Sequence, residues 1–160
     1  MNEHMERGIF VAVILGLSVA LISESQAQVD IERKIPLDAK GLYGQIASGD
    51  IPQIIDVRPL EDDSNEDVGG YLMTHIPGSI PFPNCDESAT PEDALGQIQM
   101  GVPTVIVSAE GELAAFEKCS GKFSRARNLG GGMLDWMDNF LPEDEGVYAA
   151  PMVGAGGGCL

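Results

Sequence analysis

The alternation of apolar and polar segments along the chain predicts helices interleaved with short strands. Strands are expected at 52–57, 79–82, 104–108 and 125–129, and the runs at 52–57 and 104–108 have the apolar, β-branched character of buried strands. Helices are expected between or after them, at 37–46, 90–100, 112–122 and 133–140. Because helices that alternate with apolar strands cover both faces of a parallel sheet, the pattern favours a three-layer α/β fold.

Cap and turn residues mark where several of these helices begin and end. Apolar residues at 37, 39, 42, 43 and 46 define the first helix, which contains two glycines and ends at the Ser-Gly-Asp sequence of 48–50. Thr90 is expected to cap the second helix, with Pro91 at its first position, and this helix should run to about Met100. Three glycines at 130–132 turn the chain into the last helix.

The N-terminus has the pattern of an export signal. An apolar run of 15 residues at 8–22 is shorter than the roughly 20 residues of a membrane span and fits the core of a signal peptide. Small residues at Ser25 and Ala27 predict cleavage after Ala27, and hence a periplasmic or secreted protein. Glu3 and Glu6 remove the usual positive charge ahead of the apolar run, so an uncleaved membrane anchor is the alternative.

These features divide the chain of 160 residues into four parts. Residues 1–27 are predicted to be the signal peptide and residues 28–34 a polar lead. Residues 35–145 then form a domain large enough for one modest hydrophobic core, and residues 146–160 form a Gly-rich tail that we expect to be flexible.

The chain is strongly acidic. Twenty-five acidic residues against nine basic ones give a net charge of -16, and five of the carboxylates lie in one loop at 59–70. Such a surface repels phosphate groups, which excludes nucleic acid as a partner and disfavours membrane contact once the signal has been removed. Two interpretations of the acidity stay open, namely solubility and a docking surface for a basic protein partner.

Three segments, in this order, resemble the rhodanese family. They are IDVR at 55–58, HIPGSIP at 75–81 and NLGGGMLDW at 128–136, and the likeness extends over about residues 35–142. The resemblance implies a three-layer α/β rhodanese-like fold, with a short parallel sheet and helices on both faces, in a family of sulfurtransferases. The positions shared with the family motifs are Asp56, Arg58, His75, Gly78, Gly131, Gly132 and Trp136.

We expect these shared residues to have structural roles. Arg58 can pair with nearby carboxylates, and His75 can cap the turn before Pro77. The glycines permit a tight turn from strand to helix, and Trp136 can anchor the last helix to the core.

The resemblance also indicates what the chain has lost. In active family members the strand that corresponds to 104–108 ends in a cysteine, whose persulfide is held by loop N–H groups and an arginine. Here Ala109 is expected at the position of that cysteine, and no arginine follows it before Arg125. The degenerate loop consists of Ser108, Ala109, Glu110, Gly111 and Glu112.

This loop is unsuited to sulfur transfer. Glu110 and Glu112 place negative charge where thiosulfate or a persulfide requires positive potential, and Ser108 has no evident base to activate it. We therefore assign no catalytic residue, no cofactor and no metal. The predicted function is that of a non-catalytic binding or sulfur-pathway accessory module, which contacts an unknown and possibly basic protein through loop 59–70 and the degenerate loop.

The cysteines leave an alternative open. An exported protein can form one disulfide from Cys85, Cys119 and Cys159, and Cys85–Cys119 is a candidate structural pair that rests only on the oxidising compartment. In the rival interpretation the protein is a sulfurtransferase that uses a displaced thiol, either Cys119 or Cys159 of the tail. The Cys119 to Arg125 spacing also matches that of cysteine phosphatases, but Cys119 falls in a predicted helix and not at a strand end.

Overall fold

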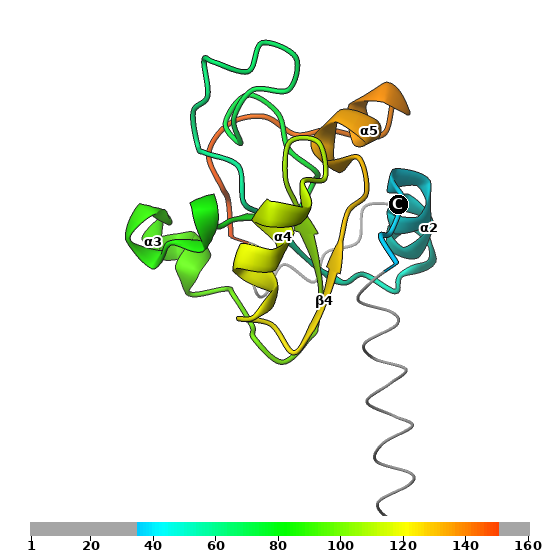
Figure 1. The fold of residues 1–160 in the computed structure, drawn as a ribbon, viewed down its shortest axis with the longest axis horizontal. Helices are drawn as coiled ribbons and strands as arrows, with labels where there is room; N and C mark the ends of the chain where they lie inside the picture. The colour runs from blue at the N-terminus through cyan, green and yellow to red at the C-terminus, as the bar shows by residue number, and fades with distance from the viewer. Residues whose placement is uncertain (1–34, 151–160) are drawn as a thin grey trace, which may run out of the picture. The chain divides into compact units, whose positions relative to one another are not determined.

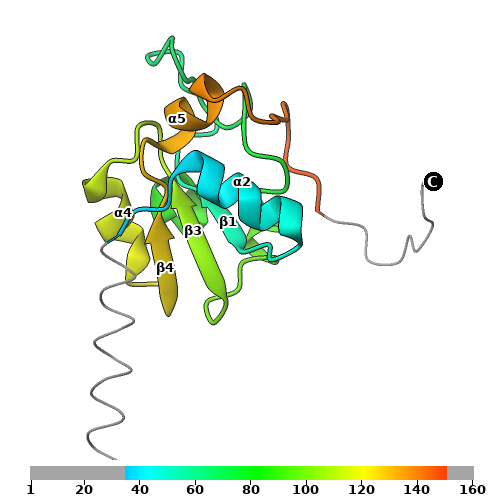
Figure 2. The ribbon, with the colours of Figure 1, turned by 90° about the vertical axis from the view of Figure 1, so that its right-hand side faces the viewer.

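The computed structural model describes residues 35–150, which form a parallel sheet with helices on both faces (Figures 1 and 2). The strands, in the order β2-β1-β3-β4, are β1 (Gln53–Asp56), β2 (Ile80–Pro81), β3 (Pro103–Val107) and β4 (Arg125–Asn128). All three pairings are parallel, with Ile55 of β1 opposite both Ile80 and Ile106. The predicted three-layer α/β fold is confirmed.

Alternate side chains of the strands build two separate cores, one on each face of the sheet. Ile54 packs in a cluster with α2 (Ala39–Ser48) and α5 (Gly132–Asp138), which lie on the same face in Figure 2. Its neighbour Ile55 belongs to the opposite cluster, with α3 (Glu92–Leu95) and α4 (Leu113–Ser120). Because successive side chains of a strand point to opposite faces, the two isoleucines of the four-residue strand β1 are enough to contribute to both cores.

Helix α2 confirms the first predicted helix, with a shift of two residues. The Asp38 carboxylate accepts the N–H of Gly41 at 2.6 Å, so Asp38 is the N-cap and the helix begins at Ala39. Leu37 instead forms a parallel bridge with Leu129. Gly49, with φ of 84°, ends the helix in the left-handed conformation.

The second predicted helix is wrong in its length, because α3 ends at Leu95 and does not reach Met100. The side chain of Gln53 holds the chain beyond α3: its Oε1 accepts the N–H of Gln99 at 2.7 Å, and its Nε2 donates to the carbonyl of Gln99 at 3.0 Å. These contacts join residues that lie 46 positions apart in the sequence, and they hold the chain beyond α3 close to β1. Thr90 is not the N-cap either, because its hydroxyl donates to the carbonyl of Asp86.

The domain contacts continue past residue 145, where the flexible tail was expected to begin. The N–H of Gly146 donates to the carbonyl of Leu72 at 2.8 Å. Tyr148 packs against the core on the face of the sheet that α3 and α4 cover, here called the α4-side core; the core on the other face is the α5-side core. The predicted signal peptide, its cleavage site, the polar lead and Cys159 lie outside the described residues. Within residues 35–150, none of the helices has the length and apolar character needed to cross a membrane.

A disulfide joins Cys85 and Cys119, the pair singled out from the sequence. Cys85 ends the short 3-10 turn η1 (Pro83–Cys85), and Cys119 lies near the end of α4. Both cysteines are buried in the α4-side core. The bond therefore fixes α4 to the segment that follows β2.

Removing this disulfide should lower the free energy of unfolding by about 2–4 kcal/mol, since it closes a loop with a sequence separation of 34 residues. The measurement is urea denaturation of the Cys85→Ala/Cys119→Ala double variant and of the reduced wild type, which keeps both side chains. Cys159→Ala is the control and should unfold like the wild type. Equal midpoints for oxidised and reduced wild type would contradict this prediction.

Candidate functional site

Polar residues of the family motifs gather where β1 and β3 end. Asp56 is the last residue of β1 and is followed two residues later by Arg58, and Ser108 directly follows β3. Asp56 and Val107 are partners in the register of these parallel strands, so both loops leave the same edge of the sheet. In parallel sheets the carboxyl edge is where ligands usually bind.

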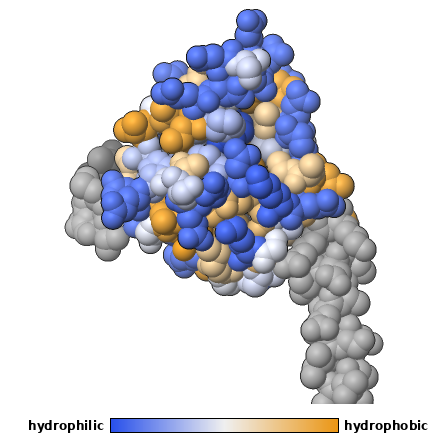
Figure 3. All heavy atoms as spheres, turned by 60° about the vertical axis from the view of Figure 1, so that its left-hand side comes forward, coloured by the Kyte–Doolittle hydropathy of each residue, from blue (hydrophilic) through white to orange (hydrophobic). Residues whose placement is uncertain are grey.

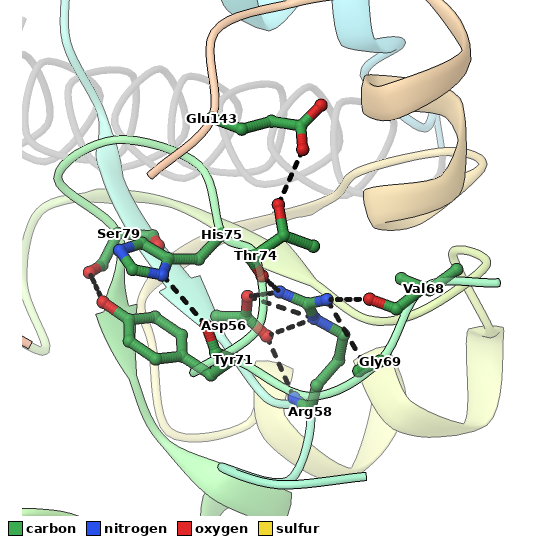
Figure 4. Close-up of polar contacts among 9 residues, drawn as sticks. All are labelled: Asp56, Arg58, Val68, Gly69, Tyr71, Thr74, His75, Ser79 and Glu143. Carbon is green, nitrogen blue, oxygen red and sulfur yellow. Dashed lines mark hydrogen bonds and ion pairs between the residues drawn. The ribbon is translucent and has the colours of Figure 1, made fainter. Parts of the chain in front are cut away.

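Arg58 is committed to structural contacts (Figure 4). Its guanidinium pairs with the Asp56 carboxylate at 2.6 Å, and both side chains are almost fully buried. It also donates to the carbonyl of Thr74 at 2.7 Å, and to those of Val68 and Gly69 at longer distances. Because its donors are taken up by these buried partners, Arg58 is not available to bind a substrate anion.

His75 is likewise held within the domain. Its Nδ1 lies 2.9 Å from the carbonyl of Tyr71, and its ring stacks on the Tyr71 ring with centroids 4.0 Å apart. Its backbone exchanges two hydrogen bonds with Asp144, while the Tyr71 hydroxyl donates to the carbonyl of Ser79 (Figure 4). Gly78, with φ of 76°, completes the turn in this segment.

The Gly-rich turn and Trp136 position the last helix. Gly131 and Gly132 both have positive φ, and a Cβ on Gly132 would collide with the carbonyl oxygen of Ser108. Trp136 is buried, and its Nε1 donates to the carbonyl of Pro142 at 2.8 Å. The absence of side chains on the glycines thus allows α5 to approach the loop after β3 at backbone distance.

Residues of α5 and β4 hold loop Ser108–Glu112 in place by donating hydrogen bonds to its carbonyl groups. The N–H groups of Met133 and Leu134, at the start of α5, donate to the carbonyls of Ser108 and Ala109 at 2.9 and 3.0 Å. Asn128, at the end of β4, donates from Nδ2 to the carbonyl of Gly111 at 2.8 Å. Three of the five loop carbonyls therefore point towards α5 and β4.

Two amide groups of the same loop meet oxygen atoms of the loop's own side chains. The N–H of Glu112 donates to Ser108 Oγ at 3.0 Å, and the N–H of Glu110 donates to Glu112 Oε2 at 3.0 Å. Burial acts to raise the pKa of Glu112, but hydrogen bonds from the Ser108 hydroxyl and from the backbone outweigh it and leave this pKa lowered. The loop thus holds an ionised carboxylate.

Ser108, and not Ala109, presents its side chain to a loop amide, that of Glu112. Strand β3 ends at Val107, one residue earlier than expected, so Ser108 is the first residue of the loop. The Ser108 side chain is 4% exposed and accepts a loop N–H, whereas Ala109 packs against the α5-side core. The expectation that Ala109 stands at the position of the cysteine stays a prediction, and the structure shows that Ser108, and not Ala109, is the first residue after β3.

Cys119 cannot serve as the displaced thiol in this structure. Its side chain is fully buried and is bonded to Cys85. Arg125 is the first residue of β4, so the phosphatase-like spacing has neither a cysteine at a strand end nor an arginine entering a helix. Among residues 35–150, no three His, Cys, Asp or Glu side chains lie close enough together to hold a metal ion.

Comparison with known proteins identifies relatives of this chain. The family model described as Rhodanese-like domain matches residues 38–139. The solution structure of a rhodanese-like domain from Anabaena is 19% identical, with a TM-score of 0.52 over 78% of this chain and 89% of that one. A Bacillus halodurans protein is 19% identical, with a TM-score of 0.53 over 77% of this chain and 85% of that one. These likenesses show the fold, and no curated protein matches the chain.

Replacing Asp56 with Asn should lower the free energy of unfolding by about 3–5 kcal/mol, because it leaves the Arg58 charge buried without a counterion. Chemical denaturation measures the loss. Glu87→Gln is the matched control, since it breaks the exposed Lys122–Glu87 pair, whose atoms are 3.7 Å apart, and should cost less than about 1 kcal/mol. Similar losses for the two variants would contradict the role given to the buried pair.

The buried Tyr71 should make the domain sensitive to alkali. Burial raises the pKa of Tyr71, and the nearby Asp56 charge raises it further. The neutral phenol is therefore favoured in the folded state, and its contribution to stability is lost as the pH rises above about 10, the value in the unfolded chain. Tyr71→Phe should reduce this decline, although it loses roughly 0.5–1.5 kcal/mol at neutral pH with the hydrogen bond to Ser79.

Unfolding free energies of both proteins between about pH 8 and pH 11 test this prediction. The two curves should converge as the pH rises. Parallel curves over this range would show that Tyr71 is not responsible.

Proposed function

Because this chain belongs to the Rhodanese-like domain family, we propose that it uses the family scaffold as an exported protein-binding module that does not itself transfer sulfur. It acts as an accessory to a sulfur-handling or redox protein and binds that protein through the acidic residues at the carboxyl edge of the sheet. The family and fold provide the scaffold, and the loop after β3 is the reason to propose a non-catalytic role.

The observation that carries this proposal is the content of loop Ser108–Glu112. Sulfur transfer requires a thiolate nucleophile, held by loop amides in positive potential. Here one loop N–H donates to the hydroxyl oxygen of Ser108 and another to the carboxylate of Glu112. An anionic sulfur donor would have to approach a site that already holds a negative charge.

Ser108 does not replace the thiol as a nucleophile. A serine hydroxyl needs a general base, and a carboxylate with a lowered pKa is a weak one. The buried His75 ring is bonded to the carbonyl of Tyr71 and stacked on the Tyr71 ring. Neither residue therefore equips Ser108 for nucleophilic attack.

The charge at this edge favours a basic partner. Loop 59–70 carries Glu61, Asp63, Glu66 and Asp67 with exposed side chains, while Arg58 at its start is buried and paired. In Figure 3 the top of the molecule, where this loop lies in Figure 1, is almost entirely hydrophilic. Exposed carboxylates with no exposed cation among them attract lysine and arginine side chains of a partner and repel anions.

Intact-mass spectrometry tests the absence of catalysis. The exported protein, purified without reductant and incubated with thiosulfate, should keep its mass. Cys159→Ala, which removes the remaining thiol considered for a displaced mechanism, should behave in the same way. A gain of one sulfur atom that is lost on adding cyanide and absent in Cys159→Ala would overturn the proposal.

A charge-removal variant tests the binding role. The four exposed carboxylates of the loop, Glu61, Asp63, Glu66 and Asp67, are replaced by their amides, and recovery of the co-purifying partner is compared with wild type at low and high salt. The matched control replaces four exposed carboxylates outside the loop, those of Glu87, Glu92, Asp93 and Glu117. Recovery should fall about tenfold for the loop variant alone, and equal recovery from all three proteins would contradict the binding surface.

A further inference from the structure

Loop Ser108–Glu112 is built so that its carbonyls face away from its own side chains. The carbonyls of Ser108, Ala109 and Gly111 are held by α5 and Asn128. Gly111 has φ of 78°, and a Cβ there would collide with backbone atoms of Gly131 and Leu129. The loop therefore cannot rotate freely, and the N–H groups of Glu110 and Glu112 keep their direction.

An amide group that is fixed in direction presents its N–H to an acceptor in its path, and a half-buried N–H without an acceptor costs free energy. The Glu112 N–H has Ser108 Oγ, which is almost completely buried. The Glu110 N–H has Glu112 Oε2. Glu112 thus folds back across the loop and places a negative oxygen on the Glu110 N–H, to which a bound anion would otherwise have access.

We propose that the Glu112 carboxylate is an internal anion that closes the loop after β3 to small oxyanions. This proposal rests on the non-catalytic function proposed above and gives it a specific cause. The contact is autoinhibitory in the simple sense that the Glu112 side chain and an external anion compete for the same N–H group, that of Glu110. Removing the side chain should open the loop to an anion even though no nucleophile is present.

Two neighbouring glutamates allow the effect of net charge to be separated from the effect of a carboxylate that occupies the loop N–H. Glu110 and Glu112 lie in the same loop, so Glu110→Ala and Glu112→Ala change the net charge equally. In the described structure only the Glu112 carboxylate accepts a loop N–H. Glu112 also provides no side-chain cap to α4, so its replacement by alanine leaves that helix start unchanged. A simple charge effect predicts equal gains for the two variants, whereas occupancy predicts a gain for Glu112→Ala alone.

The experiment is a titration with sodium thiosulfate, and separately with sodium sulfate, at constant ionic strength, followed by the amide NMR signals of residues 110 and 112. Glu112→Ala should bind either anion at least about tenfold more tightly than wild type, and Glu110→Ala should stay within about threefold of wild type. Equal affinities for the two variants, or no gain for Glu112→Ala, would overturn the proposal.

A second readout does not depend on anion binding. Since the pKa of Glu112 is lowered in the folded state, its ionised form contributes stability above about pH 4.3, and this contribution is lost as the pH falls through the folded pKa. Glu112→Gln, which is nearly isosteric, should be less stable than wild type at neutral pH and should approach it as the carboxylate becomes protonated in acid. A constant difference would contradict the bound carboxylate. Neither readout depends on sulfur uptake by the wild type, so failure here is distinguishable from failure of the proposed function.

Discussion

The buried pair of Asp56 and Arg58 sets the geometry of the carboxyl edge of the sheet. Two charges removed from water destabilise a fold unless each one is neutralised and hydrogen-bonded, and both conditions are met here. The Arg58 guanidinium reaches the carbonyls of Thr74, Val68 and Gly69 as well as the carboxylate, so it ties the end of β1 to both ends of the following segment. Loop 59–70 can consequently carry five carboxylates without regular secondary structure, because its ends are held from within.

The two loops at this edge satisfy their charged groups in different ways. Arg58 is neutralised by an opposite charge that lies two residues away, whereas the Glu112 carboxylate is held by a backbone N–H and a hydroxyl. In both cases the partner belongs to the same short segment. Both charged groups are therefore used within the protein, whereas the carboxylates of loop 59–70 that are exposed form the binding surface proposed above.

The sheet was predictable because its strands depend on local sequence. Each apolar run is short and flanked by turn residues, so strand positions were correct to within one or two residues. Helix α3 was predicted too long, because the contact between Gln53 and Gln99 that redirects the chain joins residues 46 apart. A propensity argument does not contain such a contact. The same limit applies to Asn84 and Cys85, whose positive φ values depend on the fold around the disulfide.

The site was predicted less completely, because its chemistry depends on which single residue occupies each position of the loop. A shift of one residue in a strand boundary exchanges a side chain in the loop for one in the core: the predicted strand ended at Ser108, whereas β3 ends at Val107 and Ser108 opens the loop. The charge of Glu112 was visible in the sequence, but its direction was not, because it depends on α5 fixing the loop carbonyls. Once those carbonyls are fixed, the N–H groups of Glu110 and Glu112 keep their direction whether or not a substrate exists. Ser108 provides one acceptor and Glu112 the other, so a loop shaped to hold an external anion can keep its conformation without one.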